Sequence, residues 1–387
     1  MAEQLTAINP EMLIWARGAT GTTLAEAQAK FGEDKIGAWE KGEAHPTYSE
    51  LKKIGDYYRK PIAVFFFPEP PKYENIPASC RTLPIDAEHI FNRQITKAVD
   101  WTRAMQLNLY ELFDQTNPAD QRLADLTFDL SDIKVTAAQL RDVLGADLVA
   151  QKNLKTRSDA FEFWRGYFYK LGIFVFKQAF KDDSVSGFCI YDNEFPVICV
   201  NNSIAHARQI FTLFHEIYHL IHETSGVDIL KKNTPIDRQI DSNVEWMCNR
   251  FAGAFLVPDN DFLGVSWNSD VNDEAIQKWS DKYSVSREVI LYKLFDLNRI
   301  SYDSLQQKRE EFKQDYFRKA EFDADGKKKG GGNYYANQGA YLGSQYLTAA
   351  FSSYYSKKIT VTQLSQYLGM KVHSARELAS QKGWGAI

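Results

Sequence analysis

Residues 211–222 read Phe-Thr-Leu-Phe-His-Glu-Ile-Tyr-His-Leu-Ile-His, and this stretch decides how the whole chain is interpreted. Apolar residues recur in it at three- and four-residue spacing, which predicts an amphipathic helix. On a helix, His215 and His219 lie one turn apart on the same face, so both imidazoles can reach one cation, and Glu216 projects beside them. The stretch therefore predicts a divalent metal site with a carboxylate placed for acid–base chemistry.

A third ligand has to come from elsewhere, because a hydrolytic zinc usually holds three protein ligands. Glu223 would lie on the same helix, about 12 Å along the axis from His215, which is too far to close a tetrahedron. Glu245 is better placed, because it begins a second helical stretch that can deliver a carboxylate from the side. Asn249, one turn further on, is expected to hydrogen-bond a metal-binding histidine. The sequence leaves these candidates open: Glu223, Asp228, Asp237, Asp241 and Glu245.

The segments around this stretch predict a small sheet with packed helices. Three short apolar runs are typical of strands, and the Asp192-Asn193 pair between the last two predicts a turn and an antiparallel hairpin. The sequence thus predicts an α+β unit with a small antiparallel sheet. The expected strands are 173–176, 188–191 and 197–200, and the expected helices are 161–171, 207–223 and 240–256.

The first 67 residues predict a bundle of short helices, because helix-start signals recur at close spacing. Asn9 precedes Pro10, and capping-box patterns begin at Thr23 and Thr47. The predicted first domain is residues 1–67. The rest of the chain divides by composition into four parts: a proline-rich linker with a helical connector (68–155), the α+β unit (156–300), a charged Gly/Lys hinge (301–332) and a small helical module (333–387). A helix is expected to begin at Thr360 in the last part.

The composition narrows the class of protein. The chain has 387 residues, of which 44% are hydrophobic and 25% charged, with a net charge of −4. These values favour a globular protein and argue against a uniformly basic nucleic-acid binder. None of the four cysteines forms a C-x-x-C pair, and Cys199 and Cys248 are interpreted as small buried residues. We expect a cytoplasmic protein with no membrane segment.

Four segments together resemble the ImmA/IrrE metallopeptidase family: residues 187–188, 196–201, 211–222 and 245–258. The resemblance implies a zincin-like metallopeptidase domain within a mainly α, multidomain chain. It also implies that His215, His219 and Glu245 bind the metal and that Glu216 is the catalytic base. Tyr218 stands where the family usually has a small residue, and Cys248 where alanine is common. Neither departure removes a ligand.

The N-terminal residues resemble a Cro/repressor-type (XRE) helix–turn–helix domain, through residues 24–32 and 36–47. If this domain binds DNA, the helix over residues 34–39 would enter the groove, with Lys35 and Lys41 near it. Residues 1–67 carry 8 basic and 9 acidic side chains, so phosphate neutralisation would be weak. A dimerisation or protein-docking domain is the alternative.

Two functions remain open from the sequence. The first is a metal-dependent endopeptidase that cleaves a regulatory protein, an HTH repressor or antitoxin, with Zn2+ as the expected metal and Mn2+ as the alternative. The second is a DNA-binding regulator or antitoxin in which the peptidase-like domain acts as a sensor or docking module with little proteolysis. Double-stranded DNA and a second copy of the chain are the other partners considered.

Overall fold

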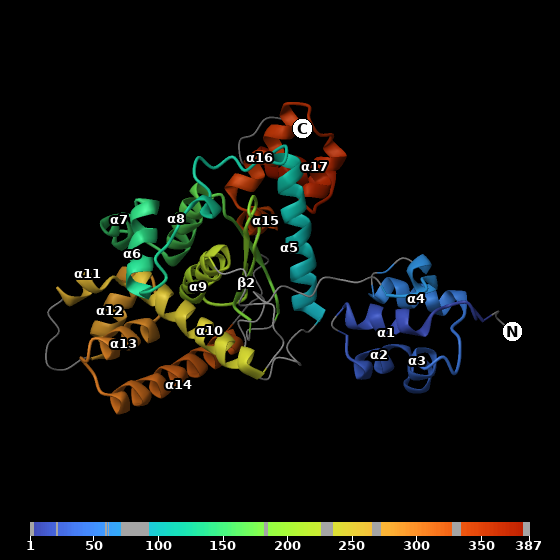
Figure 1. The fold of residues 1–387 in the computed structure, drawn as a ribbon, viewed down its shortest axis with the longest axis horizontal. Helices are drawn as coiled ribbons and strands as arrows, with labels where there is room; N and C mark the ends of the chain where they lie inside the picture. Colours follow the sequence, from blue (N-terminus) through green and yellow to red (C-terminus); the bar gives the residue numbers. More distant parts are fainter. Residues whose placement is uncertain are drawn as a thin grey trace. The chain divides into compact units, whose positions relative to one another are not determined.

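The computed structural model describes residues 4–20, 22–58, 60, 62–70, 93–181, 185–225, 235–264, 272–326 and 334–381. It divides into two compact units, residues 1–101 with 180–182, and residues 102–179 with 183–387. Each unit is built mainly from helices (Figure 1). Residues 71–92, with most of the proline-rich linker, fall outside the described residues. So do residues 327–332 of the predicted hinge at 301–332, whereas residues 302–326 of that hinge form a helix.

The first unit is a bundle of short helices: α1 (Pro10–Gly18), α2 (Leu24–Phe31), α3 (Glu33–Glu40), α4 (Tyr48–Tyr58) and the 3-10 helix η1 (Ile62–Phe66). The predicted starts are confirmed. Asn9 accepts a hydrogen bond from the Glu11 amide, and Thr23 forms a capping box with Glu26. The core of this unit includes Leu13, Ile36 and Ile54, all fully buried.

Helices α2 and α3 are separated by one residue, Gly32, with φ at 108°. This backbone conformation favours glycine, since a side chain would be strained there. An ion pair fixes α3 against α1: the Arg17 guanidinium donates to both carboxylate oxygens of Glu40, at 2.7 and 3.0 Å. Both side chains are largely buried, so this bidentate pair specifies how the two helices pack.

The second unit is organised around a three-stranded sheet. Strand β3 (Val197–Asn201) lies in the middle, between β1 (Phe174–Gln178) and β2 (Gly187–Ile190). The pair β2–β3 is antiparallel, as predicted, with Cys189 opposite Ile198. The pair β1–β3 is parallel, with Phe174 opposite Val197. The expectation of an antiparallel sheet was therefore wrong for one of the two strand pairs, because β1 pairs with β3 and runs in the same direction.

Both faces of this sheet are covered by helices, so nearly every residue of the three strands is buried. This explains why the strands read as continuous apolar runs without polar alternation. Figure 1 shows α9 (His206–Ser225) on one side of the sheet and, on the other, the part of α5 (Arg93–Leu112) that belongs to this unit, residues 102–112. Helix α8 (Arg157–Lys170) also packs against β1, and the Phe176 ring lies 5.3 Å from the Tyr346 ring of α16 (Ser344–Tyr355).

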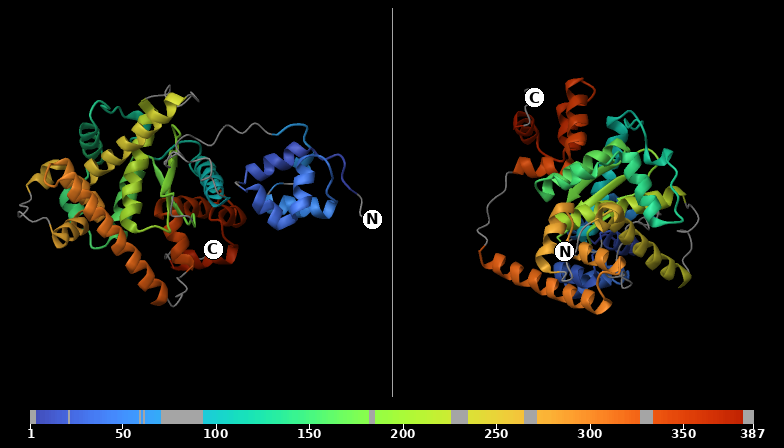
Figure 2. Two further views of the ribbon diagram at one scale, coloured as in Figure 1. Left: turned by 90° about the horizontal axis from the view of Figure 1, so that it is seen from below. Right: turned by 90° about the vertical axis from the view of Figure 1, so that its left-hand side faces the viewer.

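The remaining helices of the second unit surround this centre. The main packing partner of α9 is α10 (Pro235–Leu256). Figures 1 and 2 show the last four helices, coloured red, gathered beside the sheet. The last two agree with the predicted helices that follow Thr360 and Gly369. The other elements are η4 (Leu123–Asp125), α6 (Ile133–Leu144), α7 (Leu148–Lys152), α11 (Asp259–Leu263), α12 (Asp273–Tyr283), α13 (Arg287–Asp296), α14 (Tyr302–Gly326), α15 (Tyr334–Leu342), α17 (Val361–Tyr367) and α18 (Val372–Gln381).

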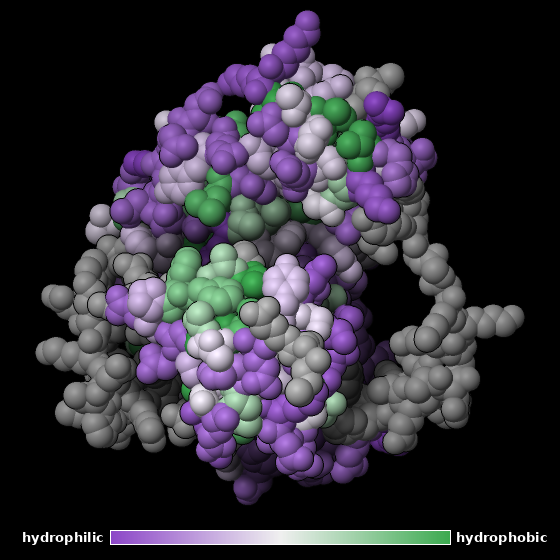
Figure 3. All heavy atoms as spheres, turned by 90° about the vertical axis from the view of Figure 1, so that its right-hand side faces the viewer, coloured by the Kyte–Doolittle hydropathy of each residue, from purple (hydrophilic) through white to green (hydrophobic). Residues whose placement is uncertain are grey.

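The molecular surface is mostly hydrophilic on the face drawn in Figure 3, with small separate hydrophobic areas. Within the part of the chain that the structure describes, no helix combines the length and apolar character needed to cross a membrane.

Candidate metal centre

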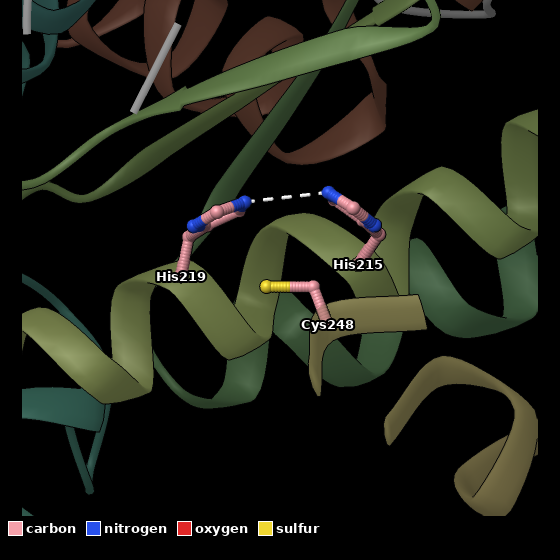
Figure 4. A group of neighbouring side chains, drawn as sticks. All are labelled: His215, His219 and Cys248. Atoms are coloured by element: carbon pink, nitrogen blue, oxygen red, sulfur yellow. Dashed lines mark hydrogen bonds between the residues drawn. The ribbon is translucent and has the colours of Figure 1, made fainter. Parts of the chain in front are cut away.

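Helix α9 carries the H-E-x-x-H residues into the interior of the second unit. Its apolar residues, including Leu213, Ile217 and Leu220, are fully buried against the sheet, α8 and α10. This packing fixes the rotation of the helix, so His215 and His219 face the same side. Their Nε2 atoms lie 3.3 Å apart (Figure 4). The one-face arrangement predicted from the four-residue spacing is confirmed.

Helix α10 brings Glu245 to the two histidines. One carboxylate oxygen lies 3.2 Å from His215 Nε2, and the other lies 3.3 Å from His219 Nε2. Ligands bound to one zinc ion at about 2.0 Å with tetrahedral angles are separated by about 3.3 Å. The three donor groups are thus already spaced as ligands of a single small cation, and two imidazoles with a carboxylate are a donor set that suits zinc.

Asn249 lies one turn beyond Glu245 and contacts the other nitrogen of the first histidine. Its Oδ1 is 3.1 Å from His215 Nδ1. A hydrogen bond to Nδ1 fixes the orientation of the ring and leaves Nε2 free to bind a metal. The contact anticipated from the position of Asn249 on the second helix is present.

Glu216 is the most buried charged group of the site, with 1% of its surface exposed. Among the described residues its Oε2 has no hydrogen-bond partner, while the carboxylate accepts a hydrogen bond from the Cys189 thiol of β2. Burial raises the pKa of Glu216, and electrostatic interaction with His215 and His219 offsets part of this rise. A buried carboxylate with one free oxygen is suited to taking up and releasing a proton.

The pKa shifts of Glu245 and His215 indicate which sign of charge the centre stabilises. Burial acts to raise the pKa of Glu245, but hydrogen bonds from His215 and His219 outweigh burial and lower it to about 2. Burial acts to lower the pKa of His215, but the contacts with Glu245 and Glu216 raise it overall. The centre therefore stabilises positive charge between the imidazoles and the carboxylate, in the form of a proton or of a metal ion.

Cys248 also lies at this centre, although its sequence context predicts only a small buried residue. Its Sγ and one ring nitrogen each of His215 and His219 all lie within 4.8 Å of one another. The thiol was expected to be a small buried residue, and it is fully buried. A signal was available, because Cys248 follows Glu245 by three residues and shares its helix face.

The other residues that the sequence singled out do not take part in this centre or lie outside the described residues. Lys35 and Lys41 lie on the first unit, where Lys35 is paired with Glu50 at 2.8 Å and Lys41 is exposed. Tyr218, the family departure next to the second histidine, is buried, and its ring lies 4.8 Å from that of Phe251 in α10. Asp228 and the side chains of Glu223, Asp237 and Asp241 fall outside the described residues.

Comparison with known protein families identifies one domain. Residues 169–295, about a third of the chain, match the model of the IrrE N-terminal-like domain, Peptidase_M78. No curated protein matches the chain. The matched segment contains α9 and α10 and thus every residue of the centre described above. This match supports an ImmA/IrrE-type metallopeptidase.

Proposed function

We propose that the chain is a metal-dependent endopeptidase that cleaves a regulatory protein, an HTH repressor or antitoxin. One observation carries the proposal: His215, His219 and Glu245 converge within 3.3 Å of one another beside the buried carboxylate of Glu216. The match of residues 169–295 to a peptidase family supports the same conclusion. The nature of the substrate rests on the resemblance of the sequence to that family.

His215, His219 and Glu245 would hold the metal, with Asn249 orienting the first histidine. A bound zinc ion supplies a Lewis acid and makes a water molecule more acidic. Glu216 would accept the proton from the attacking water and pass it to the leaving amine. Burial raises the pKa of Glu216, and a carboxylate with a raised pKa is a stronger proton acceptor than an ordinary glutamate.

An extended substrate would bind along β2, an edge strand of the described sheet that packs against α9. Main-chain hydrogen bonds to such an edge hold a peptide without strict sequence requirements. Gly187 begins this strand, and a Cβ there would lie 2.5 Å from Thr212 Cγ2 of α9. The glycine therefore permits the close approach of the edge strand to the helix that carries the motif.

The test compares cells expressing the wild-type chain with cells expressing Glu216→Gln, with and without DNA damage. Mass spectrometry identifies new peptide termini in each. We expect a helix–turn–helix protein to be cut only in the wild-type cells, while both purified proteins retain equal zinc. The isosteric amide removes only the proton acceptor, and general-base catalysis accounts for about 10²–10⁴-fold in rate.

A His215→Ala variant serves as the control, because it should lose both metal and cleavage. Cleavage at the wild-type rate by Glu216→Gln would refute the assigned role of the carboxylate. Absence of any difference between the strains under both conditions would refute the endopeptidase proposal.

We also propose DNA binding by the first unit as a second function. The observation that favours it is the succession of α2, the single residue Gly32, and α3, whose first turn is exposed. Lys41 lies directly after α3 and is exposed. A strongly salt-dependent mobility shift with the promoter of its own gene, weakened by Lys41→Ala and unaffected by Glu216→Gln, is the expected result. A shift that does not depend on salt would contradict it.

A further inference from the structure

We propose that the thiol of Cys248 is an additional donor to the metal and makes the centre selective for thiophilic cations. The inference rests on the proposed function, because it concerns the same metal. With four protein ligands the zinc would take the water molecule as a fifth ligand, a coordination number that catalytic zinc can reach. It goes beyond the ligand set of two histidines and one glutamate, since it assigns a role to a residue that the sequence presents only as a packing residue.

The position of Cys248 on its helix supports this assignment. Residues three apart on a helix share a face, so Cys248 and Glu245 both point from α10 toward α9. Figure 4 shows the Cys248 sulfur beside α9, below the two imidazoles. Its Sγ lies within 4.8 Å of one ring nitrogen of each histidine. Around one zinc ion, a thiolate and an imidazole nitrogen are separated by about 3.5 Å, so an adjustment of about 1 Å brings the sulfur into bonding range.

The thiol lies in the interior of the second unit. Cys248 is fully buried and belongs to the same hydrophobic core as the apolar residues of α9. The other buried thiols are engaged differently. Cys189 donates to Glu216, and Cys199 is hydrogen-bonded to Thr102. Of the three cysteines in the described part of the chain, Cys248 is the one grouped with the metal-site histidines.

A sulfur donor changes which metal the centre prefers. Imidazole and carboxylate ligands suit several divalent ions, including zinc and manganese. Thiolate is a soft ligand that favours zinc, cobalt or cadmium over manganese. The donor set with Cys248 therefore selects zinc over manganese, a choice that the two histidines and Glu245 leave open.

Cobalt spectroscopy of the full-length protein tests the assignment. Co2+ is added to the metal-free wild-type chain, Cys248→Ser, Cys248→Ala and Cys199→Ser, the last as a matched buried-thiol control. We expect a sulfur-to-cobalt charge-transfer band in the wild type and in Cys199→Ser. The band should be absent from both Cys248 variants. Their visible d–d bands should show that they still bind cobalt. Competition between zinc and manganese should show reduced preference for zinc in Cys248→Ser.

The outcomes separate this inference from the proposed function. Visible d–d bands without a charge-transfer band in the wild type would overturn the role of Cys248 and leave the histidine–glutamate centre standing. Loss of the band in Cys199→Ser, but not in Cys248→Ser, would also overturn it. No cobalt or zinc binding by the wild-type chain would refute the metal centre itself.

Discussion

Arg165 offers a direct test of how the C-terminal helices are attached to the sheet. The side chain lies on α8 and is almost completely buried. Its guanidinium donates to the backbone oxygens of Val175 in β1, at 2.5 and 2.8 Å, and of Ala340 and Tyr341 in the last turn of α15, at 2.8 and 3.0 Å. Carbonyls at the end of a helix have no partner within the helix, so Arg165 serves as the cap of α15.

Arg165→Met should destabilise the second unit by about 3 kcal/mol. The methionine keeps most of the apolar volume but leaves three backbone oxygens without this donor, and each buried acceptor that loses its partner costs about 1–3 kcal/mol. Water that enters the space, and the hydrogen bonds that hold β1 in the sheet, keep the summed loss of stability near the lower end of this range. The nearby Glu162 is half exposed and stays hydrated, so it adds little to the cost.

The assay is urea unfolding followed by circular dichroism, together with hydrogen exchange resolved to individual segments. Exchange should increase most in residues 334–355, because α15 loses its cap. Arg309→Met is the matched control: its partner Glu288 is 2.8 Å away, but both side chains are exposed, so the expected loss is below about 1 kcal/mol. Equal stability of Arg165→Met and the wild type, with unchanged exchange in α15, would refute this reasoning.

Three further predictions follow from the structure. Asn249→Ala should weaken zinc binding about tenfold, because His215 loses its orienting hydrogen bond. Competition with a chelator measures the affinity for zinc, and Asn249→Asp, which retains the acceptor oxygen, is the control. Gly187→Ala should lower stability and peptide cleavage together, since the added Cβ would lie 2.5 Å from a side-chain carbon of α9; unchanged unfolding would contradict it. The hydrogen bond from Lys35, with that from the Thr47 amide, lowers the pKa of Glu50 from 4.5 to about 2. Its stabilising effect on the first unit is therefore complete above pH 4.5 and is lost as the pH falls toward 2, and Glu50→Gln should remove this dependence in acid unfolding.

The local sequence was sufficient to predict the helices that carry the candidate metal site. Apolar spacing determined α9, and the four-residue interval placed His215 and His219 on one face of it. The capping residues Asn9 and Thr23 determined where α1 and α2 begin. These features depend on interactions within one or two helical turns, which a sequence shows directly.

Contacts between distant segments were decided only by the tertiary structure. The direction of β1 was not predictable, because a buried apolar strand reads the same whether its neighbour is parallel or antiparallel. The choice of Glu245 among several acidic residues depends on how α10 crosses α9, and so does the position of Cys248. Arg165 carried no sequence signal, since its partners are backbone oxygens up to 176 residues away. Such contacts arise from the packing of whole elements, and packing is a property of the folded chain rather than of any short segment.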